Sequence, residues 1–158
     1  MKTWLLALAI TALPSWSSAR DFAVGDLIIE HPFVRATPPA VQNGAGYATI
    51  ANEGIQPERL IAIETSAAGA VEFHQTVVTD GVARMQPVAD GFPIPPGGSI
   101  VIGADGTHAM LVGLRAMLIE GGEIEATLIF ERAGRVAIVF DVEPIGTPTE
   151  GHGDEHGQ

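Results

Sequence analysis

Residues 71–88, VEFHQTVVTDGVARMQPV, hold two apolar segments on either side of Asp80-Gly81. An Asp-Gly pair between such segments is a strong local signal for a β-hairpin, because both residues tolerate the positive φ angles of a tight turn. We therefore expect two antiparallel strands, Val71–Val78 and Val82–Val88.

Short apolar segments separated by Gly, Pro, Asn and Asp continue along the chain, and little repeats with the period of a helix. Residues 91–98, rich in Pro and Gly, are expected to form a loop. About nine short strands at regular spacing predict an all-β domain, a β-sandwich or small barrel. The other expected strands are Phe22–Ile29, His31–Ala36 after a bend, Gly46–Ala51, Arg59–Glu64, Ser99–Ile102, His108–Leu114, Glu123–Glu131 and Arg135–Val142.

Three segments follow from the composition along the 158 residues. Residues 1–19 have a basic start, a short apolar stretch and small residues at the end, as in a secretory signal peptide. We expect cleavage after Ala19 and a periplasmic location. Residues 20–146 are expected to form one β domain, and residues 147–158, polar and Gly-rich, a disordered acidic tail.

Charge and composition exclude several classes of protein. The formal net charge of −11 disfavours nucleic acids and anionic membrane surfaces as partners. The chain contains no cysteine, which excludes a thiol redox site and a blue-copper centre. We find no Ser-His-Asp arrangement, Gly-rich phosphate loop or paired carboxylates beside a plausible cleft, so we do not expect an enzyme.

The hairpin brings a histidine close to a methionine. If its loop has two residues, Thr76 faces Met85 and His74 faces Pro87. Side chains on one face of a strand recur every two residues, so His74, Thr76 and Met85 would share a face. His74 and Met85 would then be diagonal neighbours with Cβ atoms roughly 7–8 Å apart or less, which lets both reach one ion. A three-residue loop would break this arrangement.

A second pair lies within one expected strand. His108 and Met110 are two residues apart and therefore point the same way. Two such His-Met pairs facing each other would offer two nitrogens and two sulfurs. Thioethers are soft ligands that favour Cu(I), whereas zinc recruits thiolates, histidines or carboxylates, and calcium and magnesium prefer oxygen. Taken alone, each of these four residues is more often structural than functional, and only their combination favours a metal site. Met117, with no histidine nearby, is expected to fill the core.

The order His74, ten residues, Met85, twenty-two residues, His108-Ala109-Met110 resembles the signature of the PCu(A)C periplasmic copper chaperones. Their second spacer has about twenty-one residues, and the extra one is most simply placed in the loop between Gly91 and Gly106. The resemblance spans residues 21 to about 143. It includes stretches such as Arg35-Ala36-Thr37-Pro38-Pro39, Val71-Glu72-Phe73-His74, Leu111-Val112-Gly113-Leu114 and Phe130-Glu131-Arg132-Ala133-Gly134.

The resemblance implies a cupredoxin-like Greek-key β-sandwich or barrel. It implies Cu(I) ligation by His74, Met85, His108 and Met110, near the surface. It also implies transfer of copper toward cytochrome c oxidase assembly, with an oxidase subunit or a maturation factor as the acceptor. Ala83 and Val112 stand where relatives often carry further methionines, so we expect no surrounding methionine cluster.

Other readings stay open on the sequence alone. His152 and His156, four residues apart in the tail, could hold Cu(II) or zinc weakly, or could belong to a merely solubilising segment. The protein could be a copper buffer for resistance, without a dedicated acceptor. It could also be a secreted, metal-free β-sandwich adaptor in which the four residues are part of the core.

Overall fold

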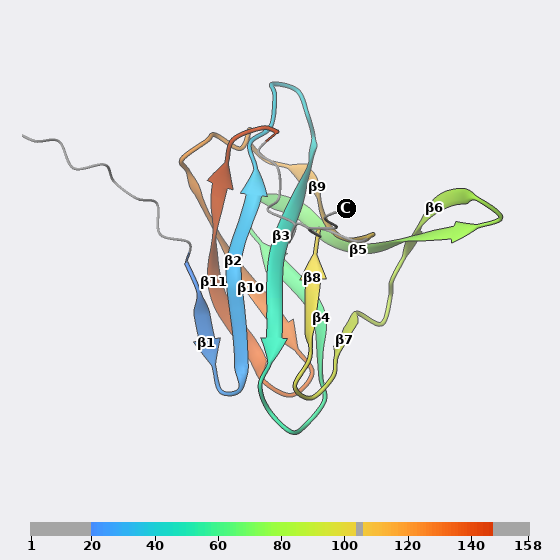
Figure 1. Ribbon diagram of the computed structural model, residues 1–158. Helices are drawn as coiled ribbons and strands as arrows, with labels where there is room; N and C mark the ends of the chain where they lie inside the picture. The colour runs from blue at the N-terminus through green and yellow to red at the C-terminus, as the bar shows by residue number, and fades with distance from the viewer. Residues whose placement is uncertain (1–19, 104–105, 147–158) are drawn as a thin grey trace, which may run out of the picture.

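The computed structural model describes residues 20–103 and 106–146, and the expected all-β fold is confirmed there (Figure 1). No helix in these two ranges is long and apolar enough to cross a membrane. The strands are β1 Phe22–Val24, β2 Leu27–Arg35, β3 Asn43–Asn52, β4 Glu58–Thr65, β5 Ala68–Thr79, β6 Val82–Pro87, β7 Phe92–Ile94, β8 Ser99–Ile102, β9 Thr107–Leu114, β10 Glu123–Phe130 and β11 Gly134–Glu143.

Two segments differ from the expectation. The strand expected over residues 22–29 is divided by a turn at Gly25-Asp26, where Gly25 has a φ of 59° and the chain reverses from β1 into β2. The loop expected over residues 91–98 contains the short strand β7, which pairs with β4. Phe92 and Ile94 of β7 are buried in the core, and this burial outweighs the Pro and Gly signal around them.

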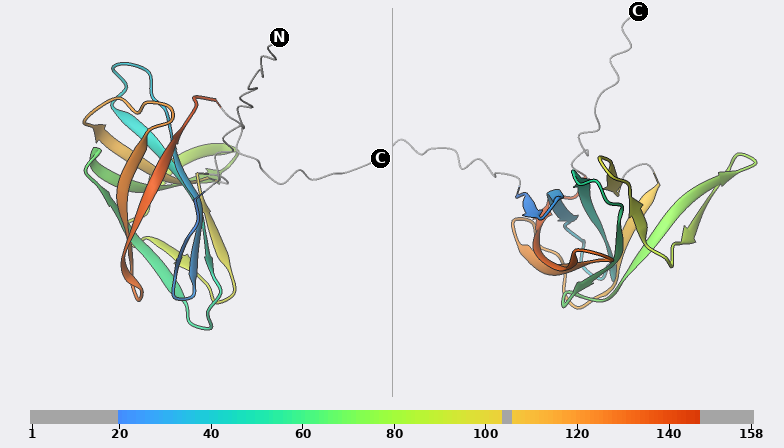
Figure 2. Two further views of the ribbon diagram at one scale, coloured as in Figure 1. Left: turned by 90° about the vertical axis from the view of Figure 1, so that its left-hand side faces the viewer. Right: turned by 90° about the horizontal axis from the view of Figure 1, so that it is seen from below.

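The strands form one sheet in the order β6-β5-β9-β3-β2-β11-β10-β4-β7, with β1 paired to β2 and β8 to β3. Some neighbours in this order, such as β5 and β9 or β10 and β4, are not consecutive in sequence. β11 runs parallel to β2, while the other strand pairs of the described residues are antiparallel. The sheet curls so that β4 comes back near β5 (Figure 2). The β5–β6 hairpin projects beyond this curled body, as both figures show.

A single apolar core fills the curled sheet. Strict alternation in β10 and β11 sends every second side chain inward, which is the pattern of a strand with one buried face. The side chains of Ile29, Ile50, Leu60 and Ile94 are completely buried. These residues come from β2, β3, β4 and β7, so the core joins strands from the middle of the sheet order to strands at its β7 end.

Replacement of one core isoleucine tests this packing. Ile50 is 0% exposed, and Ile50→Ala should lower the free energy of unfolding by about 2–5 kcal/mol, because the lost apolar contacts leave a cavity. Ile55, in a loop, is 88% exposed, and Ile55→Ala should change stability by less than about 0.5 kcal/mol. Urea unfolding of both variants measures the difference, and similar losses would contradict the assigned core.

Candidate metal centre

The turn between β5 and β6 has two residues, as expected from the Asp-Gly signal. Asp80 and Gly81 have φ angles of 53° and 77°, the left-handed values that a type I′ turn requires at both central positions. Thr79 then pairs with Val82, and Thr76 pairs with Met85. The register expected from a two-residue loop is therefore confirmed.

The second histidine and methionine enter from β9, which pairs with the other edge of β5. His74 is paired in register with His108, and Glu72 with Met110. Since side chains alternate along each strand, the four donor residues lie on one face of three adjacent strands, β6, β5 and β9. The sequence indicated the two His-Met pairs but not the β5–β9 pairing that brings them together.

The donor face is the outer face of these strands. Phe73 and Ala109, the residues beside His74 and His108, are paired with each other and buried in the core. The donor residues consequently point away from the core. His74, His108 and Met110 are half-buried, while the side chain of Met85 on the edge strand β6 is 56% exposed. The expectation of a metal-free adaptor with all four residues in the core is therefore wrong in its placement of these side chains.

Strand pairing on the other side of β9 holds its position. β9 pairs with β3 through Ala45 and Met110 and through Gly46 and Ala109. β9 is therefore fixed between β3 and β5. This pairing sets the positions of His108 and Met110 along the strand direction relative to His74.

The two imidazoles differ in their hydrogen-bonding surroundings. His108 Nε2 lies 3.3 Å from Thr76 Oγ1. His74 Nε2 lies 3.3 Å from Glu72 Oε2. His74 Nδ1 is buried and has no hydrogen-bond partner among the described residues. An unpaired buried polar atom costs about 1–3 kcal/mol, a cost that a bound metal ion would remove.

The donor types decide which metal suits this face. Two imidazole nitrogens and two thioether sulfurs form a soft, neutral set that favours Cu(I). In residues 20–103 and 106–146, no group of three or more His, Cys, Asp or Glu side chains is arranged to hold a metal ion. The described part of the chain thus offers no oxygen-rich or thiolate site that would compete for a harder metal.

The other histidines do not join this face in the described structure. His31 on β2 contacts Glu143 at 2.6 Å, and its ring packs at a tilt against Phe33. Two strands separate β2 from β5 in the sheet. His31 is therefore an exposed side chain with a structural partner away from the donor face. His152 and His156 lie outside the described residues, so their role in metal binding stays a prediction.

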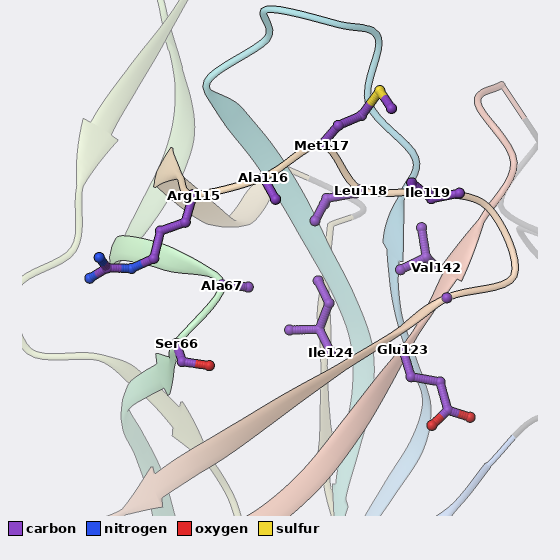
Figure 3. Close-up of a pocket in the computed structure, with 11 residues that line it drawn as sticks. Ser66, Ala67, Arg115, Ala116, Met117, Leu118, Ile119, Glu123, Ile124 and Val142 are labelled. Carbon is purple, nitrogen blue, oxygen red and sulfur yellow. The ribbon is translucent and has the colours of Figure 1, made fainter.

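The expectation that Met117 fills the core is wrong. Met117 is 46% exposed, and its neighbour Leu118 takes the buried position instead. Both line a surface pocket of about 410 Å³ that also includes Ser66, Arg115 and Ile124 (Figure 3). The pocket contains no histidine, so Met117 has no imidazole beside it and the pocket is separate from the donor face.

Comparison with known proteins places the chain in a family. The family model described as "Putative lipoprotein LpqE-like" matches residues 27–142. The chain belongs to the LpqE-like family. A relative from Leifsonia xyli subsp. xyli (strain CTCB07), named "Putative lipoprotein Lxx21020", is 30% identical over 108 residues. That match covers 68% of this chain and 65% of the relative, so this LpqE-like chain spans less than two thirds of the relative's length.

Solved structures of PCuAC domains resemble this LpqE-like protein along most of their length. The "Copper-bound PCuAC domain from PmoF2" has a TM-score of 0.67 and 30% identity, covering 79% of this chain and 98% of that domain. "CuI-DR1885 from Deinococcus Radiodurans" has a TM-score of 0.61 and 28% identity, covering 80% and 83%. The resemblance to PCu(A)C proteins and the cupredoxin-like β fold are confirmed.

Engineered disulfides test the hairpin register without any metal. Thr76→Cys/Met85→Cys should form a disulfide on mild oxidation, because directly opposed residues have Cα atoms about 4.5–5.5 Å apart. Gln75→Cys/Met85→Cys should stay reduced, since these side chains lie on opposite faces. The natural chain has no cysteine, so mass spectrometry reports each pair unambiguously. Equal oxidation of both pairs would contradict the register.

Proposed function

We propose that this protein is an exported copper metallochaperone that binds one Cu(I) ion through His74, Met85, His108 and Met110. The observation that carries the proposal is the strand pairing, which places these four residues on one outer face of β6, β5 and β9. The likeness to PCuAC domains, one of them described as copper-bound, supports copper as the cargo.

The chemistry of the donor set supports Cu(I) over other ions. Thioether sulfurs bind soft monovalent copper and are poor ligands for zinc, calcium or magnesium. The unpartnered Nδ1 of His74 provides a nitrogen whose lone pair is not engaged by the described residues. Thioethers also cannot be consumed by disulfide formation, which suits an oxidising compartment.

The exposure of the donor face supports a carrier. Met85 lies on the edge strand β6, all six residues of which are exposed. A protein partner can reach this side of the ion and replace ligands one at a time, which an enclosed site would prevent. We propose that the protein acts in the periplasm after cleavage of residues 1–19. We propose that the acceptor is a cytochrome oxidase subunit or a maturation factor, and that the protein carries copper without itself being an enzyme.

Removal of the two thioethers tests the site. In an anaerobic Cu(I) competition titration, the parent should bind one Cu(I), and Met85→Ala/Met110→Ala should bind at least tenfold more weakly, a loss of about 1.4 kcal/mol or more. Met117→Ala is the matched control, because Met117 is exposed and lies in the separate pocket; it should bind as the parent does. Equal affinity in the parent and the double variant would overturn the four-ligand site.

Delivery is tested in cells that lack the protein. The deletion strain should lose cytochrome oxidase activity under copper limitation and regain it with the parent gene but not with Met85→Ala/Met110→Ala. A buffer for copper resistance would give a different result, namely normal oxidase activity and poor growth at high copper. That outcome would keep Cu(I) binding and reject the delivery role.

The tail is tested by truncation. We propose that His152 and His156 form a weak auxiliary site for Cu(II) that does not take part in the Cu(I) site. A chain ending at residue 146 should bind one Cu(I) as tightly as the parent and should lose weak Cu(II) binding in a calorimetric titration. Loss of Cu(I) affinity on truncation would show that the tail supplies a ligand.

A further inference from the structure

The two ring nitrogens of His74 have different neighbours. Glu72, two residues earlier on β5, lies on the same face, and its Oε2 is 3.3 Å from His74 Nε2. Nδ1 on the other side of the ring is buried and has no hydrogen-bond partner among the described residues. The side chain of His74 is 12% exposed, so little water can reach the ring and supply hydrogen bonds to either nitrogen.

This asymmetry determines where the ring proton belongs. A neutral imidazole carries one N–H donor and one lone pair, and an ionised carboxylate only accepts hydrogen bonds. A carboxylate at this distance favours the proton on the nitrogen that faces it, Nε2, and that tautomer leaves the lone pair at Nδ1. The contact between Thr76 and His108 has no such consequence, because a hydroxyl group both donates and accepts.

We propose that Glu72 is a positioning residue that holds His74 in its Nε2–H tautomer and thereby makes Nδ1 the atom that binds copper. The identity of the metal rests on the proposed function, whereas the tautomer is a property of the metal-free protein. Carboxylates that accept the second N–H of a ligating histidine fix the orientation of the ring and increase the basicity of the ligand nitrogen.

Glu72 acts through His74 and is not a fifth ligand. It is paired in register with Met110, so its carboxylate borders the donor face beside a thioether. Carboxylate oxygen is a hard donor that suits magnesium, calcium or manganese, and a soft Cu(I) ion prefers the neighbouring sulfur. The exposed side chain of Glu72 can reach Nε2 at the rim of the face while Nδ1 points to a buried position.

Nitrogen NMR of the histidine rings tests the tautomer directly. In metal-free protein at alkaline pH, the ring ¹⁵N shifts of His74 should identify a protonated Nε2 and a bare Nδ1. Addition of diamagnetic Cu(I) should shift the Nδ1 resonance while Nε2 keeps its proton. A proton on Nδ1 in the metal-free protein, or copper bound at Nε2, would overturn the proposal.

Substitutions at Glu72 test its part in copper binding. Glu72→Ala should weaken Cu(I) binding about 10- to 100-fold, the usual effect of removing such a partner. Glu72→Gln keeps a carbonyl oxygen that can accept from Nε2–H and should retain most of the affinity. Glu125→Ala, at an exposed position of β10, removes the same charge from another part of the protein and should have no effect.

The outcomes separate this proposal from the proposed function. Unchanged affinity in Glu72→Ala, or an equal loss in Glu72→Gln, would reject hydrogen-bond acceptance by Glu72 as the cause. If Cu(I) shifts neither ring nitrogen of His74, the proposed copper site fails and the assignment of Nδ1 fails with it. The spectrum of the metal-free protein decides the tautomer in either case.

Discussion

The antiparallel pairing of β5 with β6 on one side and β9 on the other is the constraint on which the candidate site depends. It places His74 opposite His108 and diagonal to Met85, and it leaves Met110 on the same face. A slip of one residue on either side would send a donor to the opposite face. Two features prevent such a slip: the Asp80-Gly81 turn fixes the β6 register, and the burial of Phe73 against Ala109 fixes that of β9.

The same strands serve stability and the proposed metal binding through their two faces. Their inner side chains join the core, whose packing does not require a metal, and their outer side chains form a donor face that is partly open to solvent. A site built on paired strands is held more rigidly than one built on loops. Met85 is the exception, because it lies on an edge strand of the projecting hairpin, where the ladder is paired on one side only. This combination of three half-buried donors and one exposed donor suits an ion that is bound and then transferred to a partner protein.

Local signals in the sequence predicted the parts of this arrangement, and non-local pairing completed it. Asp80-Gly81 gave the turn and the β5–β6 register because a type I′ turn is determined by its own two residues. Short apolar segments bounded by turn residues predicted β10 and β11. No local pattern reports that His108 pairs with His74, since that depends on the packing of the whole sheet. Local signals also failed where packing outweighed them, as in β7, whose Phe92 and Ile94 are buried despite nearby Pro and Gly, and at Met117, where Leu118 fills the core.

The X-ray absorption spectrum of the Cu(I)-loaded protein tests the central claim most directly, because it identifies the atoms around the metal. Two sulfur and two nitrogen scatterers are expected in the parent, and both sulfur contributions should disappear in Met85→Ala/Met110→Ala. A copper shell of nitrogen and oxygen alone in the parent, or sulfur that persists in the double variant, would contradict a site built from the two His-Met pairs.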